Sequence, residues 1–160
     1  RTGAGESRYR RGIYTMFYRS APYPTLTTFD TPDFQSVCTR RQRSNTPLQA
    51  LNLMNDVTVL EAARGRAQRV IKEGGPDPLA RIAYAFRLAT ARAPKPAESA
   101  ILAEIFDENL ELFAKKPDAA LQYVSYGEFP RDLQLSASEL AAYTTVTSMI
   151  LNLNETVMKE

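Results

Sequence analysis

Signals for the start of a helix recur along the chain after residue 45, and they constrain its fold more than any other feature. Thr46-Pro47-Leu48-Gln49 has the pattern of a capping box with a proline at the first helical position. Asp56 and Asp77-Pro78 each place a capping carboxylate before a further helix, and Ser136-Ala137-Ser138-Glu139 is a second capping box. Apolar residues follow these starts at helical spacing. The sequence therefore predicts helices over about 47–54, 57–73, 78–91, 96–115 and 137–151, with a short helical piece near 118–125.

The first 45 residues lack such signals. Pro22, Pro24 and Pro32 interrupt any regular helix, and the threonine-rich segment 25–29 favours extended backbone. Segment 12–18 is compatible with a short strand or a buried apolar turn, and its aromatic and β-branched content favours the strand. We expect a mainly α protein, a compact bundle of about five helices with an irregular, partly extended N-terminal arm. Residues 1–160 are predicted to be a single domain, with the arm 1–45 packed on a helical body 46–160.

Composition excludes several classes of active site. The chain has no histidine, which removes the commonest metal ligand and the usual general base near neutral pH. Its single cysteine, Cys38, cannot form an intramolecular disulfide or a CxxCH haem attachment site. No apolar run approaches the roughly 20 residues of a membrane-spanning helix. We therefore expect no metal or cofactor in this chain and no membrane span, and an enzymatic role for this chain alone is disfavoured.

Charge is unevenly distributed along the chain. Residues 1–100 carry a balance of +8, whereas residues 101–160 carry −6. Internal complementarity or a solvated face is the favoured interpretation, and attraction of an anionic partner is the alternative. Arginines alternate with aromatic residues between Arg8 and Arg19, but no nucleic-acid-binding signature accompanies them, so nucleic acid is an improbable partner.

The densest polar cluster lies between Cys38 and Asp56. Arginine forks upstream of a helix N-terminus can bind a carboxylate, sulfate or phosphate group. The favoured alternative is structural, with these side chains satisfying backbone groups of the irregular arm. The candidate residues of this anion or glycan pocket are Arg40, Arg41, Arg43, Asn45, Gln49, Asn52, Asn55 and Asp56.

Other candidate groups have simpler interpretations. Asp30 and Asp33 could act as an acid and base pair, but their setting around Pro32 favours turn formation. Cys38 lies near three arginines, which would activate its thiol, yet a lone cysteine is more often only a small packing residue. Catalytic residues therefore stay unassigned.

Several segments resemble a known family. The most specific is the uninterrupted block 38–56, CTRRQRSNTPLQALNLMND, and shorter matches lie at 11–14, 29–33, 61–64, 84–90 and 151–155. On these residues the chain is similar to the C-terminal domain of planctomycete cytochrome-c-associated proteins, a domain of unknown function. Val57 departs from the pattern, because proline is expected after the Asn-Asp pair.

The resemblance implies a setting rather than an activity. Such domains end large exported multidomain proteins that carry a c-type haem module, so haem is expected only in a parent protein and this chain is expected to be a fragment of it. The implied location is periplasmic or in the cell envelope. The leading hypothesis is a non-catalytic helical domain that packs against haem-bearing or other neighbouring domains. The alternative is part of a site for binding or processing an anionic polysaccharide, built on the cluster from Arg40 to Asp56.

Overall fold

The computed structural model describes residues 9–18, 20–35, 37–40 and 44–158. The chain divides into two compact units, Arg1–Asn52 and Leu53–Glu160. All regular elements in the described residues are helical, and irregular backbone predominates before residue 47. The predicted fold class, a mainly α bundle with an irregular N-terminal arm, is therefore confirmed.

The N-terminal unit contains little regular structure. A 3-10 turn spans Gly12–Tyr14, and the short helix α1 spans Pro24–Thr28. Helix α2, Pro47–Asn55, begins in this unit and crosses its boundary. Two local predictions are wrong: the favoured strand within 12–18 is a solvent-exposed turn, and the segment 25–29 is largely helical instead of extended.

Local contacts explain why α1 forms despite its threonines. Pro24 occupies the first turn, where its fixed φ suits a helix and its missing N–H is no loss. The hydroxyls of Thr27 and Thr28 donate to the backbone oxygens of Tyr23 and Pro24 at 3.3 and 3.0 Å. The threonine hydroxyls therefore bond to backbone carbonyl groups of this short helix. The general preference of threonine for extended structure does not predict these bonds.

The helical body follows the predicted boundaries closely. Its helices are α3 Val57–Glu73, α4 Pro78–Thr90, α5 Pro96–Lys115, α6 Pro117–Tyr123, α7 Ala137–Leu151 and α8 Asn154–Val157. Asp56 Oδ1 accepts the Thr58 N–H at 2.7 Å, and Asp77 Oδ2 accepts the Ala80 N–H at 2.9 Å. These two carboxylates satisfy backbone donors that a helix start otherwise leaves unpaired, as predicted from the sequence.

The capping box predicted at the start of α7 is wrong. The Ser136 side chain makes no capping hydrogen bond. Glu139 instead pairs with Arg81 of α4, with Arg81 Nη1 at 2.8 Å from Glu139 Oε1. The Glu139 carboxylate, which the local pattern predicts to cap α7, thus forms an ion pair with a residue of a neighbouring helix instead.

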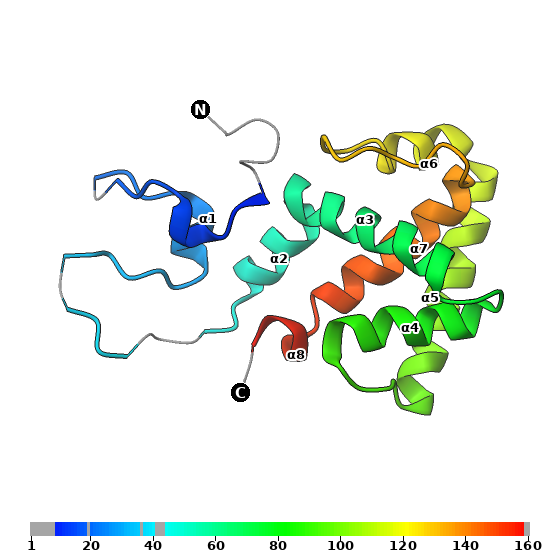
Figure 1. Ribbon diagram of the computed structural model, residues 1–160, viewed down its shortest axis with the longest axis horizontal. Helices are drawn as coiled ribbons and strands as arrows, with labels where there is room; N and C mark the ends of the chain where they lie inside the picture. The colour runs from blue at the N-terminus through cyan, green and yellow to red at the C-terminus, as the bar shows by residue number, and fades with distance from the viewer. Residues whose placement is uncertain (1–8, 19, 36, 41–43, 159–160) are drawn as a thin grey trace. The chain divides into compact units, whose positions relative to one another are not determined.

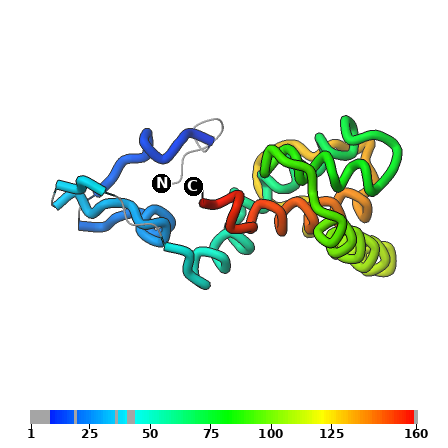
Figure 2. The backbone as a smooth tube through the Cα atoms, turned by 90° about the horizontal axis from the view of Figure 1, so that it is seen from below, coloured from blue at the N-terminus to red at the C-terminus, as the bar shows by residue number. Residues whose placement is uncertain are grey.

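Helix α7 is the centre of the body. Helices α3, α4, α5 and α6 all pack against it, as both views show (Figure 1, Figure 2). Residues on all sides of α7 are buried, which is typical of a helix enclosed by others. Its buried residues are Leu140, Ala141, Ala142, Tyr143, Thr144, Val146, Thr147 and Ile150.

Small residues allow α3 to approach α7 closely. Ala63 and Ala67 of α3 are fully buried, as is Thr147 of α7. The Thr147 hydroxyl reaches across to the backbone oxygen of Ala63 at 2.9 Å. This contact fixes which face of α3 points inward and leaves its other positions to meet the loop before α7.

None of the helices in the described residues is long and apolar enough to span a membrane.

One arginine joins the end of α4 to two other elements. Arg92 donates to both oxygens of Glu98 in α5 at 2.8 Å, and to both oxygens of Glu155 in α8 at 2.9 and 2.8 Å. Its guanidinium also lies over the Phe86 ring, 4.7 Å from the ring centre. Hydrogen bonds from Arg92 and from the Lys95 N–H lower the pKa of Glu98 to about 2, and Arg92 likewise lowers the pKa of Glu155.

This network predicts a specific acid sensitivity. Because the folded state holds the Glu98 pKa below its ordinary value of 4.5, the network stabilises the fold fully above that pH and loses its effect as pH falls toward 2. We expect the free energy of unfolding to fall less between pH 4.5 and 2 in Glu98→Gln than in the wild type. Urea unfolding followed by circular dichroism at a series of pH values measures this, with the exposed Glu104→Gln as matched control. Equal pH dependence in Glu98→Gln and the wild type would contradict the assignment.

Candidate functional site

Gln49 is the buried member of the predicted polar cluster. Its side chain is 3% exposed, and its amide donates to the backbone oxygen of Thr28 at 2.8 Å and to Ser44 Oγ at 2.9 Å. Asp30 Oδ2 accepts both the N–H and the hydroxyl of Ser44, at 3.0 and 2.6 Å. Gln49 also closes the predicted capping box with Thr46, with reciprocal bonds of 3.1 and 3.3 Å. In this unit the amide of Gln49 therefore ties the end of α1 to the start of α2.

The other described members of the predicted cluster are more exposed than Gln49. Arg40 is exposed, and its backbone oxygen accepts the Cys38 thiol at 3.4 Å. Asn45 and Asn55 are exposed, Asn52 is half-buried, and Asp56 caps α3. Arg41 and Arg43 lie outside the described residues. Anion binding by this cluster stays a prediction.

A row of polar side chains on α3 forms a second buried hydrogen-bonded site among the described residues. Glu61, Arg64 and Gln68 follow one another at intervals of three and four residues, so they lie on one face of the helix. They are 2%, 2% and 7% exposed. Buried charges require polar partners, and here the partners are backbone groups of the loop between α6 and α7.

Side chains of the row both donate hydrogen bonds to the loop backbone and accept hydrogen bonds from it. Arg64 donates to the backbone oxygens of Val124, at 2.5 Å, and of Phe129. Glu61 accepts the N–H groups of Glu128 and Phe129 at 3.2 and 2.5 Å. These two side chains thus satisfy backbone groups of a loop that has no helix or strand of its own.

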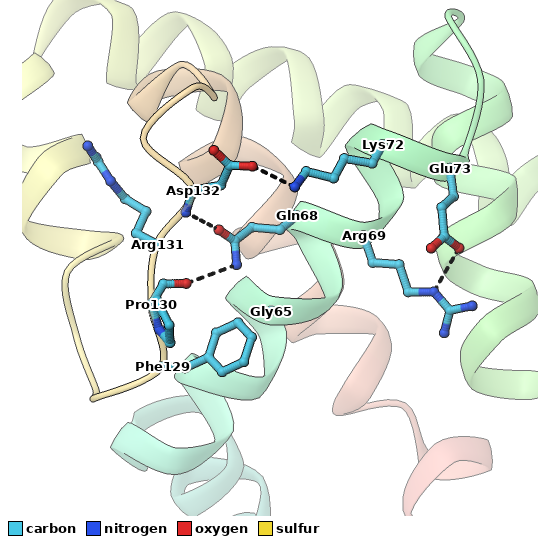
Figure 3. Close-up of a pocket in the computed structure, with 9 residues that line it drawn as sticks. All are labelled: Gly65, Gln68, Arg69, Lys72, Glu73, Phe129, Pro130, Arg131 and Asp132. Carbon is cyan, nitrogen blue, oxygen red and sulfur yellow. Dashed lines mark hydrogen bonds and ion pairs between the residues drawn. The ribbon is translucent and has the colours of Figure 1, made fainter. Parts of the chain in front are cut away.

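Gln68 extends the same row along the loop (Figure 3). It accepts the Asp132 N–H at 2.5 Å and donates to the Pro130 oxygen at 3.5 Å. One turn further, Lys72 pairs with the Asp132 carboxylate at 2.5 Å, and this ion pair lowers the Asp132 pKa. The loop is therefore held at several successive positions by one helix face.

A surface pocket of about 430 Å³ lies between this loop and α3. The Phe129 ring lies beside Gly65, whereas the Arg131 side chain leads away from Lys72 and Glu73 (Figure 3). Four of the pocket's charged side chains occur in pairs, Arg69 with Glu73 and Lys72 with Asp132, whereas Arg131 Nη1 has no hydrogen-bond partner. Glu73 accepts hydrogen bonds from the Tyr84 hydroxyl at 2.5 Å and from Arg69 Nε at 2.8 Å, and these bonds lower its pKa. Among the described residues no group of three or more histidine, cysteine, aspartate or glutamate side chains is placed to hold a metal ion.

The sequence analysis missed the polar row, although a signal for it was present. Its members have the same helical spacing as the apolar stripe of α3 formed by Ala63, Ala67 and Val70. Spacing alone cannot distinguish a buried polar row from a solvated one, because both show the same period. The backbone of a loop some 60 residues further on decides between them.

The fold and this site define a helical domain in which side chains of one helix hold a long irregular loop. The chain matches the family PSD1, described as a protein of unknown function (DUF1553), over residues 1–106. The protein therefore belongs to this uncharacterised family. The matched region includes the N-terminal unit, the predicted cluster and the polar row of α3. No curated protein and no solved structure matches the chain.

Gly127 offers a test of the contact between Glu61 and the loop. Its φ is +88°, and a Cβ built there would lie 2.2 Å from Glu61 Oε2. Gly75 has a similar φ of +92° but open space around its Cβ position. We expect Gly75→Ala to cost about 1 kcal/mol of unfolding free energy from backbone strain alone. Gly127→Ala should cost at least about 1 kcal/mol more, because it displaces a buried carboxylate from its partners.

Chemical unfolding of both variants measures the difference. Gly75→Ala is the matched control, since it carries the backbone strain without the clash. Equal losses in the two variants would show that Glu61 does not require the space beside Gly127.

Proposed function

We propose that this chain is a non-catalytic helical domain that docks onto neighbouring domains of a larger protein through its N-terminal unit. The observation that carries the proposal is the burial pattern of that unit. Gln49 is its buried residue, whereas the apolar core lies entirely in the helical body among the described residues. A unit that leaves its large apolar side chains in solvent is typical of an interaction surface.

The exposed apolar side chains are numerous and large. Ile13, Met16 and Val37 are 81%, 72% and 91% exposed. Other large apolar residues of the unit that are exposed are Tyr9, Tyr14, Tyr18, Tyr23, Phe34, Leu48 and Leu51. Covering such side chains gains roughly 25 cal/mol for each Å² of apolar surface removed from water. Contact with another domain is the simplest way for a folded protein to obtain this gain.

The resemblance to planctomycete cytochrome-c-associated domains supports the choice of partner. We propose other domains of the same exported protein, one of them bearing a c-type haem, as the surface that covers the N-terminal unit. The polar row of α3 supports a structural role for the helical body, because its buried charges are bonded to backbone groups.

The native thiol of Cys38 provides the test. It is exposed and adjacent to Val37. We expect Cys38 to react at least about tenfold more slowly with a thiol reagent in the full-length protein than in this 160-residue chain, because docking removes its neighbourhood from solvent. Mass spectrometry of reaction time courses measures both rates. Equal rates, or a mature native protein no larger than 17.9 kDa, would contradict the proposal.

Two variants make the test specific to the N-terminal unit. Val37→Ser should leave the unfolding free energy of the 160-residue chain within about 0.5 kcal/mol of the wild type, and should raise the Cys38 rate in the full-length protein. The matched control is Leu133→Ser, since Leu133 is 80% exposed in the helical body. A rate that rises equally in both variants would show general loosening instead of a docked surface.

A further inference from the structure

Arg66 on α3 carries a partly buried positive charge without a matching carboxylate. Its Nη1 atom is buried and has no hydrogen-bond partner, and no carboxylate pairs with it among the described residues. Burial, followed by the charge of Arg69, lowers the pKa of Arg66. This nitrogen, Nη1, is in an unfavourable setting, since burial has removed its water and no protein acceptor replaces it.

The pocket beside Arg66 differs in charge from the larger pocket next to it. A cavity of about 280 Å³ is lined by Gly65, Arg66, Arg69 and Leu88. Two of these residues are arginines and none is acidic. The larger pocket shares Gly65 and Arg69 and also contains Glu73 and Asp132, which pair with Arg69 and Lys72. It contains Arg131 as well, whose Nη1 atom has no hydrogen-bond partner. Among the described residues, each pocket therefore holds one arginine without an acidic partner, and the smaller pocket has no acidic residue in its lining.

Arg66 and Arg69 line the same pocket, but they differ in how firmly their guanidinium groups are held. Arg69 is fixed by its Nε–H bond to Glu73, so one edge of its guanidinium is held while the side chain stays 55% exposed. Arg66 lines the same pocket from the next turn of α3, where residues three apart are neighbours. Planar guanidinium forks bind carboxylate, sulfate and phosphate groups with geometric specificity. Leu88 supplies an apolar wall that lowers the local dielectric and strengthens such a contact.

We propose that Arg66 and Arg69 form a binding site for a single oxyanion group, a carboxylate, sulfate or phosphate, in the pocket bounded by Gly65 and Leu88. An anion there supplies the negative charge that the chain itself does not place beside Arg66. This site uses no residue of the N-terminal unit or of the cluster predicted from Arg40 to Asp56, so the proposal stands independently of the proposed docking role.

The test is titration of the 160-residue chain with sodium phosphate, sulfate or acetate at constant ionic strength, set with sodium chloride. The Nε–Hε resonances of the arginines, observed by nuclear magnetic resonance, report binding at each side chain. We expect saturable shifts of the Arg66 and Arg69 signals with at least one anion. The anion that binds with the highest affinity shows whether the site prefers a tetrahedral group, as in phosphate and sulfate, or the planar carboxylate of acetate. Absence of a saturable shift at Arg66 with all three would overturn the proposal.

Matched variants separate a site from general electrostatics. Arg66→Met should weaken binding by about tenfold or more, because it removes charge-assisted hydrogen bonds. Arg87→Met removes an exposed arginine of α4 outside the pocket and should change the affinity by less than about twofold. Equal weakening in the two variants would overturn the proposal.

Stability provides a second readout. Without added anion, Arg66→Met should unfold with a free energy equal to or above that of the wild type, since it removes a buried group that has no partner. Arg66→Lys keeps the positive charge but lacks the planar guanidinium group, so this variant should also bind the anion at least about tenfold more weakly than the wild type. A large loss of stability in Arg66→Met would contradict the premise that Arg66 is unpaired, and wild-type affinity in Arg66→Lys would contradict recognition by a fork.

Discussion

The contact between the polar row of α3 and the backbone of the loop after α6 is the interaction on which the helical body depends. Arg64 and Glu61 are almost fully buried, and each bonds to backbone groups of that loop. Removing either side chain would leave loop groups without partners in a poorly hydrated position. The loop in turn connects α6 to α7, the helix at the centre of the body. One face of α3 therefore helps to set where the central helix begins.

Most of the helical body could be predicted from the sequence because its helix starts are encoded locally. The carboxylates of Asp56 and Asp77 bond to N–H groups only two or three residues away, so spacing alone reveals them. Prediction failed in two places for different reasons. Glu139 pairs with Arg81 instead of closing a capping box, and α1 forms from a segment whose threonines favour extended backbone. Such outcomes depend on residues that are distant in the chain or on hydroxyl contacts that propensity scales do not contain.

The candidate site was less predictable than the fold for a physical reason. Gln49 was selected as a polar residue on a helix, but its bonds to Thr28 and Ser44 depend on the path of an irregular segment. Arg64 and Arg66 are close in sequence and of the same type, yet one is bonded to loop carbonyls and the other lines a pocket that has no acidic residue in its lining. Only the positions of neighbouring elements distinguish these two arginines. Structure and sequence together thus separate a structural arginine from a candidate ligand-binding one within a single turn of α3.

Amide hydrogen exchange at Phe129 and Asp132 tests the central claim most directly. Both N–H groups lie in a loop without helix or strand, and their acceptors are the side chains of Glu61 and Gln68. If the row of α3 holds the loop, these two amides exchange as slowly as amides of the α7 core, because they open only when the helical body opens. Exchange at Phe129 and Asp132 as fast as at exposed Leu133 would contradict this account of the fold.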